Sequence, residues 1–287
     1  MAENYNFLFW NVNQNYKNKN INNIIQAIVD IVDKKKINFV LLAETKLMDS
    51  SLLLTSLKAV NKNFKYRGKH EILLEKRFMA FDTLNTKVHQ DTDTDKRITS
   101  FIYNINKVKV ILNLVHLRDK YNYDTYSLNE YAKDHVGYIY EIERKEKSDN
   151  SIVVGDFNLD PYEHGIMGVK GFNAIMCSKT VENKGKRTFG KYDYNYFYNP
   201  SWELIGKSNS TGTLGTYFFN DSGKVDLALW HVLDQVLIRQ GLLKHYKPNS
   251  LEIIKEIPSL HKFINRNGKP NATKYSDHLP LIFTLEF

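Results

Sequence analysis

Apolar residues recur along the chain in two spacings that predict alternating strands and helices. Short continuous apolar runs, typical of buried strands, cover Phe7 to Trp10, Asn38 to Ala43 and the stretch 151–157. Isoleucines at helical spacing predict a helix over roughly 20 to 35, and a similar apolar stripe predicts one from Asp124 to Lys147. Strands and helices that alternate in this way indicate an α/β chain.

The middle of the chain adds strands that follow one another without a helix between them. Arg97 to Asn104 and Val108 to Leu117 have the pattern of two strands joined by a short turn. Leu279 to Phe287 is expected to close the chain as a last strand, and residues 172–223 are expected to be irregular. This mixture predicts a sheet-based sandwich with helices on the outside.

Length and composition favour one domain over residues 1–287. The chain has 287 residues, 42% of them hydrophobic, with no linker rich in proline, glycine or serine and no repeat. It also has no apolar run long enough to span a membrane, so no membrane partner is expected. No signal peptide is visible and Cys177 is the only cysteine, which together predict a cytoplasmic protein. The net charge of +8 favours a polyanionic partner such as nucleic acid, while the oligomeric state stays open.

Polar residues fall repeatedly just after the predicted strands. They are Asn11, Glu44, His116, Asp156 and Asn158. Connections that each end in a polar group at one edge of a sheet would build one shared pocket. The acid and the amide of Gly155-Asp156-Phe157-Asn158 suit a phosphate group, since a carboxylate can take a proton and an amide can donate to a phosphoryl oxygen.

Each of the other candidate residues also has an ordinary structural explanation. Glu44 either caps a turn or holds a hard cation such as Mg²⁺, and His116 is either a half-buried strand histidine or an acid to a leaving oxygen. Asp277 and His278 form either a polar turn or a pair that binds metal and moves a proton. In the functional interpretation, Asp234 orients His278 and fixes its tautomer.

Six motifs that contain these residues occur in one order along nearly the whole chain. They are Trp10-Asn11-Val12-Asn13, Ala43-Glu44-Thr45, Asn113-Leu114-Val115-His116-Leu117, Gly155-Asp156-Phe157-Asn158, Asp234-Gln235-Val236 and Ser276-Asp277-His278-Leu279-Pro280. In this order they resemble the endonuclease/exonuclease/phosphatase superfamily, which includes pancreatic deoxyribonuclease and abasic-site endonucleases. The resemblance implies a four-layer α/β sandwich, with two packed mixed sheets flanked by helices.

The same resemblance implies a metal site and a role for each motif residue. Glu44 and Asp277 would hold Mg²⁺ or Mn²⁺ with Asn11 nearby, and Asn13 would contact the substrate. Whether one metal acts or two stays open. The cation and its ligands would position the substrate and neutralise charge, as phosphate transfer to water requires.

The remaining motif residues would carry out the hydrolysis. Asp156 would orient or deprotonate the attacking water, and Asn158 would bind a phosphoryl oxygen. His116 and His278 would stabilise the transition state or move protons, and Asp234 would hold His278. All five residues are therefore predicted to be catalytic.

The sequence excludes some branches of the superfamily without selecting a substrate. Asp160 stands where inositol 5-phosphatases are expected to have arginine, and the predicted lack of export signal and disulfides disfavours secreted sphingomyelinases and pancreatic-type nucleases. What remains is an intracellular, bacterial-type member of the superfamily with no diagnostic substrate motif.

The segment 184–202 is a candidate substrate element. It interleaves basic and aromatic residues, among them Lys186, Arg187 and Tyr194, which could follow a phosphate backbone and stack on bases. The alternative is that its aromatic side chains pack beneath a long loop while its lysines are solvated.

The resulting hypothesis is a metal-dependent phosphodiester hydrolase, a nuclease acting on DNA or RNA. The first alternative is a phosphatase or phosphodiesterase that acts on a small-molecule or lipid phosphoester. The second is a non-catalytic binding module with the same fold, which the joint presence of the acids and both histidines disfavours.

Overall fold

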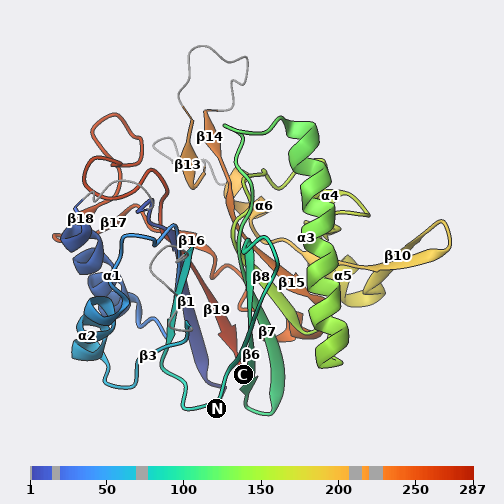
Figure 1. Cartoon of the computed structure of the whole chain (residues 1–287), viewed down its shortest axis with the longest axis horizontal. Helices are drawn as coiled ribbons and strands as arrows, with labels where there is room; N and C mark the ends of the chain where they lie inside the picture. Colours follow the sequence, from blue (N-terminus) through green and yellow to red (C-terminus); the bar gives the residue numbers. More distant parts are fainter. Residues whose placement is uncertain (1, 15–19, 69–76, 207–214, 220–228) are drawn as a thin grey trace. The chain divides into compact units, whose positions relative to one another are not determined.

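The computed structural model describes residues 2–14, 20–68, 77–206, 215–219 and 229–287. The chain forms two compact units, drawn in Figure 1. The first contains Met1–Lys87, Ser208–His231 and Lys247–Phe287, and the second contains Val88–Lys207 and Val232–Tyr246. The backbone passes between the two units four times. The expectation of one domain over residues 1–287 stays a prediction.

The first unit is built on a six-stranded mixed sheet with the order β16-β19-β1-β2-β4-β3. Its strands are β1 (Asn4–Asn11), β2 (Phe39–Ala43), β3 (Lys65–Tyr66), β4 (Phe78–Asp82), β16 (Glu252–Ile253) and β19 (Leu281–Glu286). At its centre β1 runs parallel to β2 and antiparallel to β19, so the first and last strands of the chain are neighbours. Two small two-stranded antiparallel sheets belong to the same unit: β13 (Tyr217–Phe218) with β14 (Trp230–His231), and β17 (Glu256–Ile257) with β18 (His261–Lys262).

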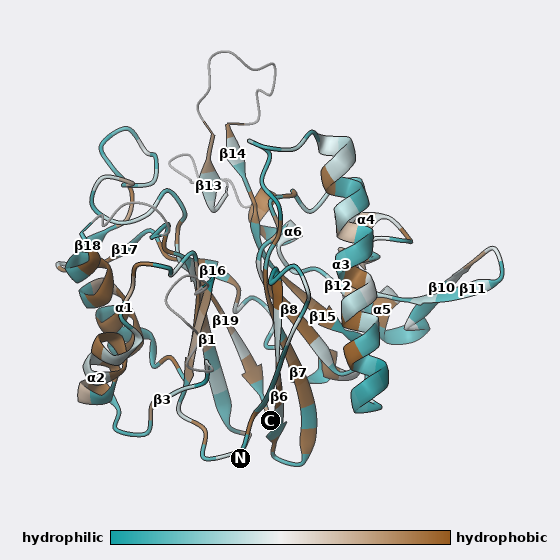
Figure 2. Ribbon diagram, in the orientation of Figure 1, coloured by the Kyte–Doolittle hydropathy of each residue, from teal (hydrophilic) through white to brown (hydrophobic). Residues whose placement is uncertain are grey.

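Two helices cover one face of this sheet. They are α1 (Ile21–Lys35) and α2 (Ser50–Val60), whose apolar sides are visible in Figure 2. The isoleucines of α1 pack with Leu8, Trp10 and Leu42, which confirms the helix predicted from their spacing. On the other face of β1, Phe7 stacks on Phe39 with ring centroids 4.2 Å apart. Both faces of the sheet are therefore apolar, as the continuous apolar runs of its strands require.

The second unit is built on a seven-stranded mixed sheet with the order β5-β6-β7-β8-β15-β12-β9. Its strands are β5 (His89–Thr92), β6 (Ile98–Ile105), β7 (Val108–His116), β8 (Ser151–Asp156), β9 (Ala174–Ile175), β12 (Phe197–Tyr198) and β15 (Asp234–Arg239). The predicted strand pair is present as β6 and β7, which run antiparallel. β7 and β8 run parallel, so their carboxyl ends lie at the same edge of the sheet.

The long helix α3 (Thr125–Glu146) covers one face of the second sheet. Its stripe of buried residues, including Leu128, Ala132 and Ile139, packs on Val153 and Leu237 of the strands. Three shorter helices and a 3₁₀ helix complete the unit: α4 (His164–Met167), α5 (Ser178–Lys184), α6 (Trp202–Gly206) and η1 (Gln240–His245).

The expectation that residues 172–223 are irregular is wrong for much of the described part of that range. β10 (Lys186–Phe189) and β11 (Tyr192–Asn195) form an antiparallel hairpin, here called the ribbon. Its residues alternate between two faces with the period of a strand, but polar and aromatic residues occur on the same strand and obscure the pattern. Residues 207–214 and 220–223 lie outside the described residues.

Two large mixed sheets with accompanying helices confirm the predicted α/β fold class. Among the helices that the structure describes, none is both long and apolar enough to cross a bilayer.

Candidate active site

Three predicted catalytic residues lie side by side across the second sheet. His116 is the last residue of β7, Asp156 the last of β8 and Asp234 the first of β15. Because β15 runs antiparallel to β8, its first residue is paired with Asp156, while His116 is paired with Asp156 from the other side. Strand register therefore aligns these three residues, here called the strand-end row.

The side chains of the strand-end row are close together and almost completely buried. His116 Nε2 lies 3.8 Å from Asp156 Oδ2, and carboxylate oxygens of Asp156 and Asp234 lie within 4.8 Å of each other. Asp156 is 1% exposed and Asp234 is 0% exposed. Two buried carboxylates and an imidazole, groups of the kind that move protons in enzymes, are thus gathered at one edge of the sheet.

The turn after β8 places Asn158 beside Asp156. The backbone N–H of Asn158 donates to Asp156 Oδ1 at 2.9 Å, and the φ of Asn158 is 53°, a left-handed conformation that asparagine tolerates well. Its side-chain Nδ2 donates to the carbonyl oxygen of Leu117 at 3.1 Å. That bond uses one of the two amide hydrogens and fixes the direction of the side chain. The amide is thus held next to the carboxylate, as the motif predicts.

Gly155 is required by the close approach of β8 to β7. A Cβ atom at this position would lie 2.0 Å from the carbonyl oxygen of Val115, the residue paired with Gly155. No side chain fits at that distance. The glycine of the motif therefore has a steric role, and it brings Asp156 into line with His116.

A buried network that the sequence did not reveal fixes the turn after β8 to the start of β15. Asp160 Oδ1 accepts from the backbone N–H of Val232 at 2.8 Å. Gln235 Nε2 donates to the carbonyl oxygens of Leu159 and Val232. Asp160 is 2% exposed and Gln235 is 0% exposed, so these bonds are shielded from water. The polar residue after Asp234 therefore helps to position the strand-end row.

In the first unit, Glu44 and Asn11 meet at the carboxyl ends of β1 and β2. Asn11 Nδ2 donates to Glu44 Oε1 at 3.0 Å. Glu44 has a φ of 56°, which is unusual for a residue with a long side chain and costs free energy. Burial raises the pKa of Glu44, and the negative charge of Asp277 raises it further, whereas Asn11, His278 and Arg77 lower it. Glu44 and Asp277, both partly buried, therefore repel each other.

The loop before β19 is tied to the end of β1 by side-chain hydrogen bonds. Asn13 Nδ2 donates to Asp277 Oδ1 at 2.8 Å. The hydroxyl group of Ser276 donates to the carbonyl oxygen of Asn11 at 2.7 Å and accepts from the backbone N–H of His278 at 3.2 Å. The predicted residues of this unit are thus brought together, and Asn13 contacts Asp277 directly.

His278 is held by two aromatic residues. Trp10 Nε1 donates to the backbone carbonyl oxygen of His278 at 2.9 Å. The rings of Tyr217 and His278 are 4.8 Å apart, and the two residues form an isolated β-bridge. No role could be predicted for Tyr217 or Arg77, because both reach this region through pairing between distant parts of the chain. His278 belongs to the first unit and Asp234 to the second, and the prediction that Asp234 holds His278 stays a prediction.

Solved structures share this arrangement of elements over the whole chain. No family model and no curated protein sequence matches the chain. The structure of D. rerio TDP2 complexed with a single-strand DNA product aligns with a TM-score of 0.56 and 15% identity, covering 99% of both chains. The chain has the endonuclease/exonuclease/phosphatase fold.

Two further structures with this fold come from microorganisms. An endonuclease/exonuclease/phosphatase family protein from Bacteroides thetaiotaomicron has a TM-score of 0.57 and 13% identity, covering 100% of this chain and 99% of its own. An AP endonuclease from Archaeoglobus fulgidus has a TM-score of 0.53 and 14% identity, with 97% and 98% covered. They confirm the fold that the motifs imply.

The polar residues of the first unit have the chemistry of a site for a divalent cation. Glu44 and Asp277 supply carboxylate oxygens, the donors that Mg²⁺ and Mn²⁺ prefer. The amide of Asn11 donates to Glu44 through Nδ2 and accepts from the backbone N–H of Asn13 through Oδ1, so it orients the Glu44 carboxylate. The raised pKa of Glu44 points the same way, since a cation would offset both its burial and the charge of Asp277.

The structure does not bring the predicted substrate element to the strand-end row. The residues in question lie on the ribbon: Lys186, Arg187 and Tyr194. The ribbon joins the sheet beside Arg239, whose Nη1 donates to the carbonyl oxygen of Asn195 at 2.7 Å. Arg239 is the last residue of β15 and Asp234 is the first, so the ribbon starts at the opposite end of that strand. A substrate-binding role for these three residues stays a prediction.

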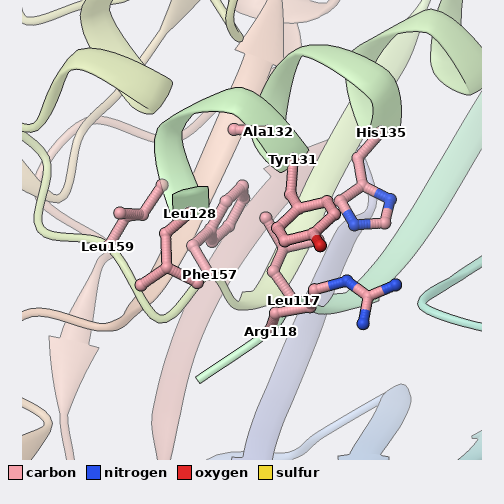
Figure 3. Close-up of a pocket in the computed structure, with 8 residues that line it drawn as sticks. All are labelled: Leu117, Arg118, Leu128, Tyr131, Ala132, His135, Phe157 and Leu159. Carbon is pink, nitrogen blue, oxygen red and sulfur yellow. The ribbon is translucent and has the colours of Figure 1, made fainter. Parts of the chain in front are cut away.

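A pocket beneath α3 does not belong to the strand-end row. Figure 3 shows its lining, which is mostly apolar and includes Leu117, Leu128, Phe157 and Leu159. Leu117 and Phe157 follow His116 and Asp156 directly, but they point into the core between the sheet and α3. The pocket is therefore part of the packing of α3 and does not suit a phosphoester.

Proposed function

We propose that this protein is a divalent-metal-dependent phosphodiester hydrolase, a nuclease that cleaves DNA or RNA by in-line attack of an activated water. The strand-end row carries the proposal. Two buried carboxylates and an imidazole held in strand register form a constellation suited to proton transfer at a phosphoryl centre. The fold supports it, since structures with this fold include a TDP2 complexed with a single-strand DNA product and an AP endonuclease.

In the second unit, each residue of the row and of the following turn has a proposed role. Asp156 orients the attacking water and takes its proton. The backbone N–H of Asn158 holds Asp156 Oδ1, and Asp156 Oδ2 lies 3.8 Å from His116 Nε2. The second amide hydrogen of Asn158 donates to a phosphoryl oxygen, while the first holds the side chain against Leu117. His116 stabilises the charge that develops on the phosphoryl group.

In the first unit, Glu44 and Asp277 would hold the cation, Mg²⁺ or Mn²⁺, and Asn11 would orient Glu44. When bound, such a cation neutralises negative charge on the phosphate. Asn13 fixes Asp277 Oδ1 and contributes to substrate binding. His278 donates a proton or a hydrogen bond to the phosphate, and Asp234 is proposed to fix its tautomer.

A polynucleotide is favoured over a small phosphoester by charge. The net charge of +8 raises the local concentration of a polyanion and speeds its association. A small-molecule or lipid phosphoester would gain less from a charge spread over a chain of this length.

The proposal is tested by incubating the purified protein with plasmid DNA, single-stranded DNA, RNA and a panel of small phosphoesters. The expected result is nucleic-acid cleavage with Mg²⁺ or Mn²⁺ that stops with chelator and in Asp156→Asn. Asp134→Asn, which changes an exposed carboxylate on α3, is the matched control and retains activity. Turnover of small phosphoesters with no cleavage of any nucleic acid would remove the nuclease assignment in favour of a phosphatase.

A further inference from the structure

The two faces of the ribbon differ in chemistry. Residues paired across an antiparallel hairpin share a face, and successive pairs alternate between the two faces. Arg187 is paired with Tyr194, and Phe189 with Tyr192, so one face carries an arginine and three aromatic rings. The other face is polar: Lys186 and Thr188 both contact the carboxylate of Asp193.

The aromatic face is exposed to solvent. Phe189 is 56% exposed and Tyr192 is 60% exposed. In Figure 1 the ribbon extends away from α5 and from the sheet of the second unit. A cross-strand pair of rings adds little to the stability of a hairpin, whereas burial of the rings against a partner would add more, so a cluster of exposed rings indicates a surface that binds a partner.

The charge around the ribbon matches a polyanion. Residues 178–196 contain five basic and two acidic residues, a formal net charge of +3. One of the acids, Asp193, is already engaged with Lys186 on the polar face. On the aromatic face, Arg187 is partly exposed, and its Nη2 makes one long bond of 3.4 Å to the carbonyl oxygen of Met167. A guanidinium has five N–H donors, so this single long bond leaves others for a phosphate, although Nε is buried.

We infer that the aromatic face of the ribbon binds single-stranded nucleic acid, as a second contact outside the strand-end row. Aromatic rings stack on unpaired bases while neighbouring cations follow the phosphates, which is how single strands are bound without sequence preference. A protein partner with an apolar patch would use the rings but would leave the basic excess without a counterpart. In naming a substrate class, the inference rests on the proposed function.

The position of the ribbon sets the minimum length of a single-stranded nucleic acid that can contact both the ribbon and the strand-end row. It joins the sheet beside Arg239, five residues along β15 from Asp234, which corresponds to about 17 Å. A stacked single strand rises about 3.4 Å per nucleotide, so at least about five nucleotides separate the row from the ribbon. Nucleic-acid single strands long enough to contact the row and the ribbon together gain affinity from the ribbon. Shorter nucleic acids cannot contact the two regions at once, so they do not gain this affinity.

The inference is tested by fluorescence anisotropy with labelled oligothymidylates of 4 and 20 nucleotides, measured with chelator so that no cleavage occurs. The double variant Phe189→Ala/Tyr192→Ala is expected to bind the 20-mer about 5- to 100-fold more weakly than wild type. The polar-face variant Thr188→Ala is the matched control and is expected to bind as wild type does. Thermal unfolding checks that all variants are folded.

Three outcomes would overturn the inference. They are equal 20-mer affinity in wild type and the double variant, an equal loss in Thr188→Ala, and a change in oligomeric state of the double variant in size-exclusion chromatography, which would assign the rings to a protein interface. Failure of the proposed function is separate, since it is seen as absent cleavage by wild type while oligothymidylate binding persists.

Discussion

The two units place polar residues at the ends of their strands by different means. In the second unit, the strand-end row is fixed by backbone pairing, since His116, Asp156 and Asp234 are partners on three adjacent strands. In the first unit, Glu44 and Asp277 lie in loops that follow or precede strands, and side-chain hydrogen bonds hold them.

This difference separates two kinds of sensitivity to mutation. Residues fixed by register keep their positions when a neighbouring side chain changes, so a substitution in the row removes chemistry without moving its neighbours. Residues fixed by side-chain bonds move when a supporting partner is lost, so in the first unit the supporting residues also matter for activity.

The largest effect is expected from Asp156→Asn. The amide keeps an oxygen for the backbone N–H of Asn158 but cannot accept a proton from water, so kcat should fall about 10³- to 10⁴-fold. The free energy of unfolding should change by less than about 1 kcal/mol, because the strand pairing is untouched. Single-turnover cleavage and urea unfolding measure both. A folded variant with wild-type kcat would exclude Asp156 from the chemistry.

Glu44→Gln is expected to lower activity about 10²- to 10³-fold while stabilising the metal-free protein. Burial raises the pKa of Glu44 above 4.5, so the folded state binds the proton more tightly than the unfolded chain does. Stability is therefore lost as pH rises from the ordinary value through the folded pKa, and glutamine avoids that loss.

Thermal scans with and without Mg²⁺ test this expectation. At pH 7 without metal, the Tm of Glu44→Gln should exceed that of wild type, and the rise in Tm that the cation gives to wild type should shrink or disappear. A lower Tm in the metal-free variant would contradict the assigned environment of Glu44.

Ser276→Ala tests whether the first unit depends on supporting bonds. It removes a hydroxyl group that joins the end of β1 to the loop carrying Asp277 and His278. We expect a loss of about 1 to 3 kcal/mol in unfolding free energy and about a tenfold loss in kcat. Ser276→Thr, which keeps the hydroxyl group, should recover most of both. Full activity in the alanine variant would show that the loop does not need this support.

The smallest effect is expected from Tyr217→Leu, which removes the ring next to His278. Aromatic contacts of this kind contribute about 0.5 to 1.5 kcal/mol, so kcat should fall about 2- to 10-fold. If Tyr217 positions the imidazole, the pH profile of kcat should shift as well, and Tyr217→Phe should restore it. A changed KM with an unaltered pH profile would instead make Tyr217 a substrate contact.

Much of the fold could be predicted because local patterns and tertiary pairing agree. The isoleucines of α1 and the apolar runs of β1, β2 and β8 are buried as their spacing requires. The order of the motifs then predicted the fold, and strand pairing brought His116 and Asp234 beside Asp156.

The site residues that could not be predicted depend on contacts between distant parts of the chain, which no local sequence pattern indicates. Tyr217 meets His278, and Arg77 acts on Glu44, across long stretches of sequence. The ribbon was missed for another reason: each of its strands carries polar and aromatic residues together, so no apolar face marked it as a strand.

The pairing of the two chain ends has a consequence for biosynthesis. β19, formed by Leu281–Glu286, lies between β16 and β1, and the backbone of Phe287 bonds to Glu3. A nascent chain on the ribosome therefore has one side of β1 unpaired until Leu281–Glu286 have been synthesised. A product terminated before Ser276 lacks β19 and the Asp277-His278 pair that precedes it, so it would be released both unstable and without one of the two proposed histidines.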